Sequence, residues 1–130
     1  MRPFNDRQFA TVTALPGPDR YGHLVDHAAE AGELWSLRGS DGWALMADDS
    51  GHELVPVWPH PRYAAACATG PLAGAEPASI PLDRLLDAWT PGITRDGRLV
   101  AVFPTPAGAG VVVPPERLRD DLAAAREGLG

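Results

Sequence analysis

The chain has 130 residues, of which 45% are hydrophobic and 22% charged, and its formal net charge is −6. These values are typical of an ordinary globular domain, so we expect one folded domain and no whole-chain disorder. The acidic balance argues against a general affinity for nucleic acid, because the neutralisation of phosphates drives such binding.

Two residue counts exclude several kinds of chemistry. The 11 basic residues are all arginines, and the chain has one cysteine, Cys67. Without lysine, the phosphate-loop lysine, the kinase lysine and Schiff-base mechanisms are excluded. One cysteine excludes an internal disulfide and a multi-cysteine zinc or iron–sulfur site. The sequence therefore predicts no cofactor.

The hydropathy pattern gives no sign of a membrane segment. No apolar run reaches the roughly 20 residues that span a bilayer, and the N-terminus lacks the apolar core of a signal peptide. We expect a soluble cytoplasmic protein with no membrane partner.

Along the chain, residues 1–17 are predicted to be a partly flexible lead-in segment, and residues 18–130 a single α/β domain. A helix is expected over 19–31, capped by Asp19 and ended by Gly32. Three extended runs follow at 34–38, 43–47 and 53–58. Their connections are rich in turn-forming residues, so an antiparallel meander is the simplest arrangement.

The second half of the chain alternates helices with extended runs. Pro61 starts a predicted helix to residue 68, and 71–78 is a predicted loop that leads to a short extended piece at 79–80. A helix over 82–89 is expected to be broken by Pro91 and Gly92. A hairpin of 98–103 with 111–113 follows, and a last helix begins near Pro115 with Leu118 and Leu122 facing inward.

The order α-βββ-α-α-ββ-α predicts an α+β fold, with one mixed, mostly antiparallel sheet of about five or six strands flanked by about four helices. Several strands carry apolar residues on both alternations, for example Trp43 and Leu45 against Ala44 and Met46. Such a sheet must be covered on both faces, or it offers one face to a partner. A protein partner or a homodimer is therefore expected.

Several stretches resemble the bacterial family known as domain of unknown function 2750, and the match covers about residues 20–122. The most family-like pieces are Asp41-Gly42-Trp43-Ala44, Val57-Trp58-Pro59-His60, Phe103-Pro104-Thr105 and Val111-Val112-Val113-Pro114-Pro115. The resemblance implies a fold but no activity, cofactor or catalytic residue. A similarity of layout also extends to the N-terminal domain of the SseB family.

Two places carry histidines that could do chemistry. His23 and His27 lie four residues apart, so both rings can meet one metal ion, but two solvated histidines on a helix face are the more common case. His60 lies between Pro59 and Pro61 at a strand-to-helix corner. It can act as a base or grip an anion, or its ring can cap a backbone group, which the lack of a nearby nucleophile favours.

The sequence supports two functional hypotheses. We favour a non-enzymatic protein-interaction module, which binds through a sheet face or through an acidic turn at Asp48 and Asp49; an immunity protein that neutralises a basic toxin is one version of it. The alternative is a small-molecule binding domain or minor enzyme. Its pocket would be formed by four residues, Trp43, Trp58, His60 and Tyr63.

Overall fold

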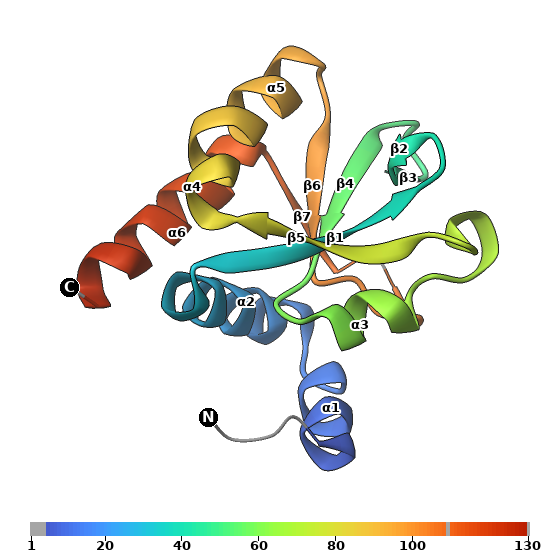
Figure 1. The fold of residues 1–130 in the computed structure, drawn as a ribbon, viewed down its shortest axis with the longest axis horizontal. Coiled ribbons are helices and arrows are strands. Elements are labelled where there is room, and N and C mark those ends of the chain that lie inside the picture. The colour runs from blue at the N-terminus through green and yellow to red at the C-terminus, as the bar shows by residue number, and fades with distance from the viewer. Residues whose placement is uncertain (1–4, 109, 130) are drawn as a thin grey trace.

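Strands from both halves of the chain form two sheets that meet at the centre of the molecule (Figure 1). The computed structural model describes residues 5–108 and 110–129. The first sheet contains β1 (Glu33–Gly39), β2 (Gly42–Trp43) and β5 (Glu76–Pro81), in the order β2-β1-β5. The second contains β3 (Met46–Ala47), β4 (Glu53–Val57), β6 (Leu99–Val102) and β7 (Val111–Val113), in the order β3-β4-β6-β7. The α+β class is confirmed, with two sheets in place of the predicted single sheet.

The predicted meander is wrong at its second strand, because residues 43–47 divide between the two sheets. Trp43 pairs with Arg38 of β1, whereas Met46 pairs with Leu54 of β4. Both alternations of this segment are apolar, so the sequence does not reveal where the backbone leaves one sheet and enters the other.

Two tryptophans join the sheets. The backbone groups of Trp35 in β1 and Trp58, which follows β4, exchange two hydrogen bonds of 2.8 Å. The Ser36 hydroxyl also donates to the buried Pro56 carbonyl, at 2.6 Å. The two sheets therefore share one core.

The segment predicted to be a loop ends in a long strand. Gly70–Leu72 forms a 3₁₀ turn, and β5 then pairs antiparallel with β1 from Glu76 to Pro81. Pro77 and Pro81 both lie in β5, which is an edge strand, where a residue without an N–H is tolerated.

Helix α2 (Gly17–Ala31) confirms the first predicted helix, and Gly32 ends it in the left-handed conformation with φ of 77°. The predicted cap is wrong: Pro16 precedes the first turn, and Asp19 lies inside it. A proline in the first turn costs no hydrogen bond, so the helix starts earlier than Asp19.

The predicted lead-in segment contains a helix, α1 (Asp6–Thr13). Asn5 caps it by accepting a hydrogen bond from the Gln8 N–H at 2.8 Å. Phe9 stacks on Tyr63 of α3 (Pro61–Ala66), with ring centroids 5.3 Å apart, so α1 is attached to the domain through α3. The mobility predicted for the first few residues concerns positions 1–4, which lie outside the described residues.

One helical run covers 82–95, so the predicted break at Pro91 is wrong. It consists of α4 (Leu82–Arg84), a π-helical turn (Leu85–Trp89) and α5 (Thr90–Arg95). The Thr90 N–H and hydroxyl both donate to the Leu85 carbonyl, five residues earlier. This wider turn before Pro91 accommodates the missing N–H without ending the helix.

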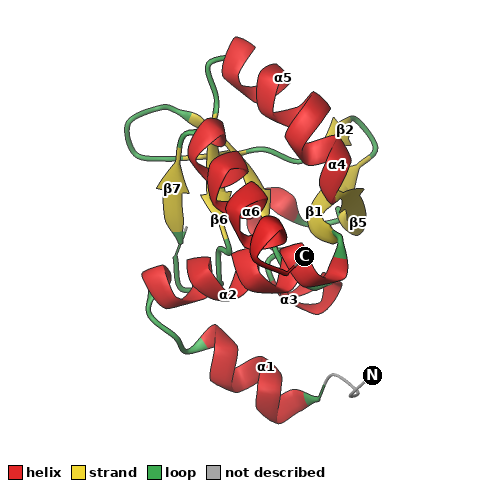
Figure 2. Ribbon diagram, turned by 90° about the vertical axis from the view of Figure 1, so that its left-hand side faces the viewer, coloured by secondary structure: helices red, strands yellow, loops and turns green. Residues whose placement is uncertain are grey.

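Helices lie along the sheets but leave the end with β2 and β3 uncovered (Figure 1, Figure 2). The predicted hairpin is confirmed as β6 and β7, and the last helix as α6 (Pro115–Leu129), with Leu118 and Leu122 buried. Helix α6 packs against α2 and α5, while α3 packs against β1 and β5. Within the ranges 5–108 and 110–129, no helix has both the length and the apolar character required to cross a membrane.

Candidate functional site

Two of the four predicted pocket residues lie in the core. Trp58 has no exposed surface and Tyr63 is 3% exposed. The Trp58 Nε1–H donates to the Pro104 carbonyl at 2.8 Å, and the Tyr63 ring packs on Phe103 with centroids 4.7 Å apart. These aromatic rings hold the two halves of the chain together.

His60 caps α3. Its Nδ1 accepts a hydrogen bond from the Arg62 N–H at 3.1 Å, so the ring satisfies a helix-terminal donor. Burial lowers the pKa of His60, and the charges of His27 and Arg62 lower it further. A chemical role for His60 beyond this cap stays a prediction.

Trp43 lies at a different place in the first sheet. It pairs with Arg38, whereas Trp58 pairs with Trp35, three residues earlier on β1, or about 10 Å along the strand. The Trp43 ring meets Trp89 edge to face, with centroids 4.6 Å apart, and the Arg38 guanidinium lies 5.5 Å from its centre. The structure therefore brings Trp58, His60 and Tyr63 together without Trp43.

His23 and His27 lie next to each other on α2. Their rings are nearly parallel, with centroids 6.0 Å apart, and His23 also packs on Phe103. Burial, followed by the charge of His27, lowers the pKa of His23. In the described part of the chain, no group of three or more potential ligand side chains is suitable for a metal ion.

The acidic turn joins β3 to β4. Oδ1 of Asp48 accepts hydrogen bonds from the backbone N–H groups of Ser50 and His52, both at 2.9 Å, and these bonds lower the Asp48 pKa. Asp48 therefore fixes the turn, whereas Asp49 is exposed.

Family-like pieces from the two halves of the chain meet at a buried corner, which we define as residues 57–60 with 103–105. The Pro104 carbonyl accepts from Trp58 and from the Cys67 thiol, at 3.4 Å from Sγ. The Phe103 carbonyl accepts from Nε–H of the buried Arg20 at 3.1 Å. Phe103 has φ of 58°, a conformation that a bulky residue rarely adopts. The corner is locked by hydrogen bonds and by packing.

An open groove lies beside this corner. One cavity of about 480 Å³ is walled by the β3 segment, by the chain that follows α3 and by the segment after β6. Its lining is mostly apolar and comprises Leu45, Met46, Ala47, Glu53, Cys67, Thr69, Pro71, Leu72, Pro104, Thr105 and Pro106.

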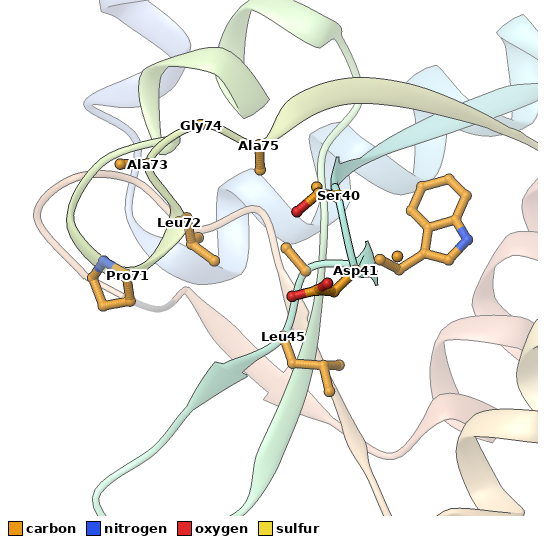
Figure 3. Close-up of a pocket in the computed structure, with 12 residues that line it drawn as sticks. Ser40, Asp41, Leu45, Pro71, Leu72, Ala73, Gly74 and Ala75 are labelled. Carbon is orange, nitrogen blue, oxygen red and sulfur yellow. The ribbon is translucent and has the colours of Figure 1, made fainter.

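A second cavity of about 400 Å³ continues from the first, because both are lined by Leu45, Pro71 and Leu72. Figure 3 shows its two walls: Ser40, Asp41 and Leu45 face the turn that runs from Pro71 to Ala75. We call the two cavities together the groove; residues 39–47, 67–75 and 104–106 bound it, with Glu53.

Acidic side chains surround the groove. Asp41 and Glu53 line it, and Asp49 lies in the turn that follows β3. Glu53 is paired with Arg98, at 3.3 Å. Within residues 5–108 and 110–129, Asp41 and Asp49 form no ion pair, so their charges are available to a ligand.

Sequence reasoning missed most of the groove. Pro71 and Leu72 were predicted to lie in a plain loop, and Pro104 and Pro106 in a hairpin connection. One available signal was Leu72 itself, a large apolar residue in a segment of glycine, alanine and proline, where a solvated loop would carry polar residues.

The fold and the groove define a small α+β domain with an open groove on its surface, and the comparisons assign it to a family. The family described as "Protein of unknown function (DUF2750)" matches residues 21–122, so the chain belongs to this family. No curated protein and no solved structure matches the chain. The similarity of layout to the SseB family stays a prediction.

Proposed function

We propose that this protein is a non-enzymatic interaction module that holds a cationic segment of a partner protein in the groove. The observation that carries the proposal is the groove itself: the lining of its larger cavity is mostly apolar, and the carboxylate of Asp41, which forms no ion pair among the described residues, lines its smaller cavity. Apolar contacts supply affinity, and complementary charge selects the partner and steers its approach.

The shape of the groove supports a chain-like ligand. Its two cavities are neighbours that share Leu45, Pro71 and Leu72, and each is open to solvent between segments from separate parts of the chain. A peptide segment can occupy both cavities with successive side chains. A basic toxin is one class of partner that this acidic surface suits.

A comparison of matched baits tests the proposal. The wild-type protein, Asp49→Arg and Asp87→Arg are used to capture proteins from the native cell, and the retained proteins are quantified by mass spectrometry. Asp87 is an exposed carboxylate on the helical run 82–95, so its variant makes the same charge change away from the groove. We expect a partner with a basic surface to be retained by wild type and Asp87→Arg and lost from Asp49→Arg. Equal capture by all three baits would contradict the proposal.

A small-molecule ligand is the second candidate. The cavity of about 480 Å³ falls within the range of about 300–1,000 Å³ that is usual for such sites. Mass spectrometry of small molecules released from the purified protein checks this candidate. Recovery of one compound from wild type but not from Leu72→Arg would favour it over the peptide.

A further inference from the structure

The free edge of β3 borders the groove. β3 is the terminal strand in the order β3-β4-β6-β7, and its residues Met46 and Ala47 both line the larger cavity. An edge strand presents backbone N–H and C=O groups that no neighbouring strand satisfies. A ligand in this cavity therefore lies beside backbone hydrogen-bonding groups that β4 does not use.

The hydrogen-bond pattern shows which backbone groups point outward. The Asp48 N–H donates to the His52 carbonyl at 3.1 Å, and hydrogen-bonded pairs alternate along an antiparallel ladder. Met46 therefore exchanges hydrogen bonds with Leu54, whereas the pair Ala47 and Glu53 does not. The N–H and C=O of Ala47, an exposed residue, point away from β4.

The outer edge of β5, in the first sheet, differs from the edge of β3 in its backbone donors. The Leu82 N–H donates to the Gly32 carbonyl at 2.9 Å, so Leu82 and Gly32 form a hydrogen-bonded pair. By the same alternation, the backbone hydrogen-bonding groups of residues 77, 79 and 81 in β5 point away from β1. Two of these positions are Pro77 and Pro81, which have no N–H. Prolines therefore protect the outer edge of β5 against strand addition, while β3 has no such protection.

We propose that the partner segment binds in an extended conformation and adds to the second sheet as a strand beside β3. This inference rests on the proposed function and specifies how the groove holds its ligand. The N–H and C=O of Ala47 pair with the main chain of the ligand. Alternate ligand side chains then enter the apolar cavity near Met46 and Leu72, and the intervening basic side chains face Asp49.

The pairing can be tested with a synthetic probe, a short fluorescent peptide in which valine and arginine alternate. In two further versions, every second residue carries an N-methyl group. One version is methylated on its valines and the other on its arginines, and we call these the two phases. N-methylation removes N–H donors and keeps the charges and the side chains. We expect one phase to weaken binding by about tenfold or more and the other phase to have a smaller effect, because only one row of N–H groups faces β3.

A matched pair of proline variants tests the protein side. Ala47→Pro removes the outward N–H of β3, and Ser79→Pro removes the outward N–H of β5, which does not line the groove. We expect Ala47→Pro to weaken binding of the unmodified peptide by about fivefold or more, and Ser79→Pro to leave it unchanged.

The outcomes separate the two proposals. If the unmodified peptide binds and Asp49→Arg weakens it, but neither N-methylated phase nor Ala47→Pro changes the affinity, strand addition is overturned and the groove remains the binding site. If the unmodified peptide does not bind, or binds Asp49→Arg and wild type equally, both proposals are overturned. Because the methylated peptides leave the protein unaltered, a folding defect in Ala47→Pro does not obscure the result.

Discussion

The buried corner and the groove are neighbours that differ in almost every physical respect. At the corner, Trp58, Arg20 and Cys67 donate to the carbonyls of Phe103 and Pro104, and the aromatic rings are buried. In the groove, Leu72 and Met46 are partly exposed, and Asp41 in the groove and Asp49 beside it have no ion-pair partner in the described residues. The corner uses its polar groups internally, whereas the groove leaves its polar groups for a ligand.

The two regions also show that a distinctive stretch of sequence can have different structural roles. Two of the family-like pieces, those that contain Trp58 and Phe103, build the corner and so stabilise the fold. A third, Asp41-Gly42-Trp43-Ala44, lines the groove, and residues 67–75 add small residues and prolines that attract little notice in the sequence. A distinctive stretch of sequence therefore belongs to the fold in one place and to the groove in another, and Pro104 and Thr105 belong to both regions.

The strongest test of the corner is the substitution Trp58→Ala. It removes a fully buried indole and one of the two donors to the Pro104 carbonyl, so we expect a loss of about 3–5 kcal/mol in the free energy of unfolding. Denaturant unfolding followed by circular dichroism measures it. Trp58→Phe keeps much of the volume and is expected to cost about 1–3 kcal/mol. An effect of Trp58→Ala below about 1 kcal/mol would show that the corner does not stabilise the fold.

A second test concerns the backbone next to the corner. A Cβ at Gly110 would lie 2.4 Å from the Val102 carbonyl oxygen and 2.9 Å from that of Phe103, and Gly110 has φ of 77°. We expect Gly110→Ala to lower the free energy of unfolding by about 2–3 kcal/mol. Gly22→Ala is the control, since its Cβ meets no atom within 4 Å in helix α2, and it is expected to stabilise by about 0.5–1 kcal/mol. Equal effects of the two variants would contradict the close approach.

The pH dependence of stability tests the histidines around the corner. Burial holds the pKa values of His23 and His60 below the ordinary value of 6.5, so the unfolded chain binds more protons than the folded chain near this pH. Stability is therefore complete above about pH 6.5 and falls as the pH falls below it. Thermal unfolding across this range measures the slope. The double variant His23→Gln with His60→Asn retains a capping side chain at position 60, and we expect its stability to depend less steeply on pH. An unchanged slope would show that other groups cause the pH dependence of stability.

The smallest effects on stability are expected in the groove and in the acidic turn beside it. Leu72→Ala removes a half-exposed side chain and is expected to cost less than about 1 kcal/mol, and Asp49→Asn less than about 0.5 kcal/mol. Both variants are expected to weaken binding of the valine–arginine peptide about fivefold or more, which fluorescence anisotropy measures. A loss of stability as large as that of Trp58→Ala, with no change in binding, would make the groove a structural element.

The sequence predicts much of the fold, because several elements carry local signals. Gly32 ends α2, Pro115 starts α6, and the buried pair Leu118 and Leu122 follows helical spacing. Features that depend on contacts between distant residues, or on the geometry of a whole helical turn, could not be predicted from such local signals. Residues 43–47 change sheets through pairing with β1 and β4, and Pro91 is retained in a helix because the preceding turn widens.

The candidate site was less predictable than the fold. The capping role of His60 follows from its position before Pro61, and the structure bears it out. The predicted four-residue pocket requires Trp43 and Trp58 to share an open face, but Trp58 is enclosed in the core, whereas Trp43 pairs with Arg38 and lines the groove. The groove depends on the approach of three distant segments, and no local pattern encodes such an approach.

The most direct test of the account is a map of amide chemical shifts during titration with the valine–arginine peptide. If the groove binds and the corner only stabilises, the largest shifts will occur at Ala47, Thr69 and Leu72, which all line the larger cavity, and the amides of His60 and Tyr63 will change little. Shifts centred on His60 and Tyr63, or no saturable shifts at all, would contradict the assignment of binding to the groove.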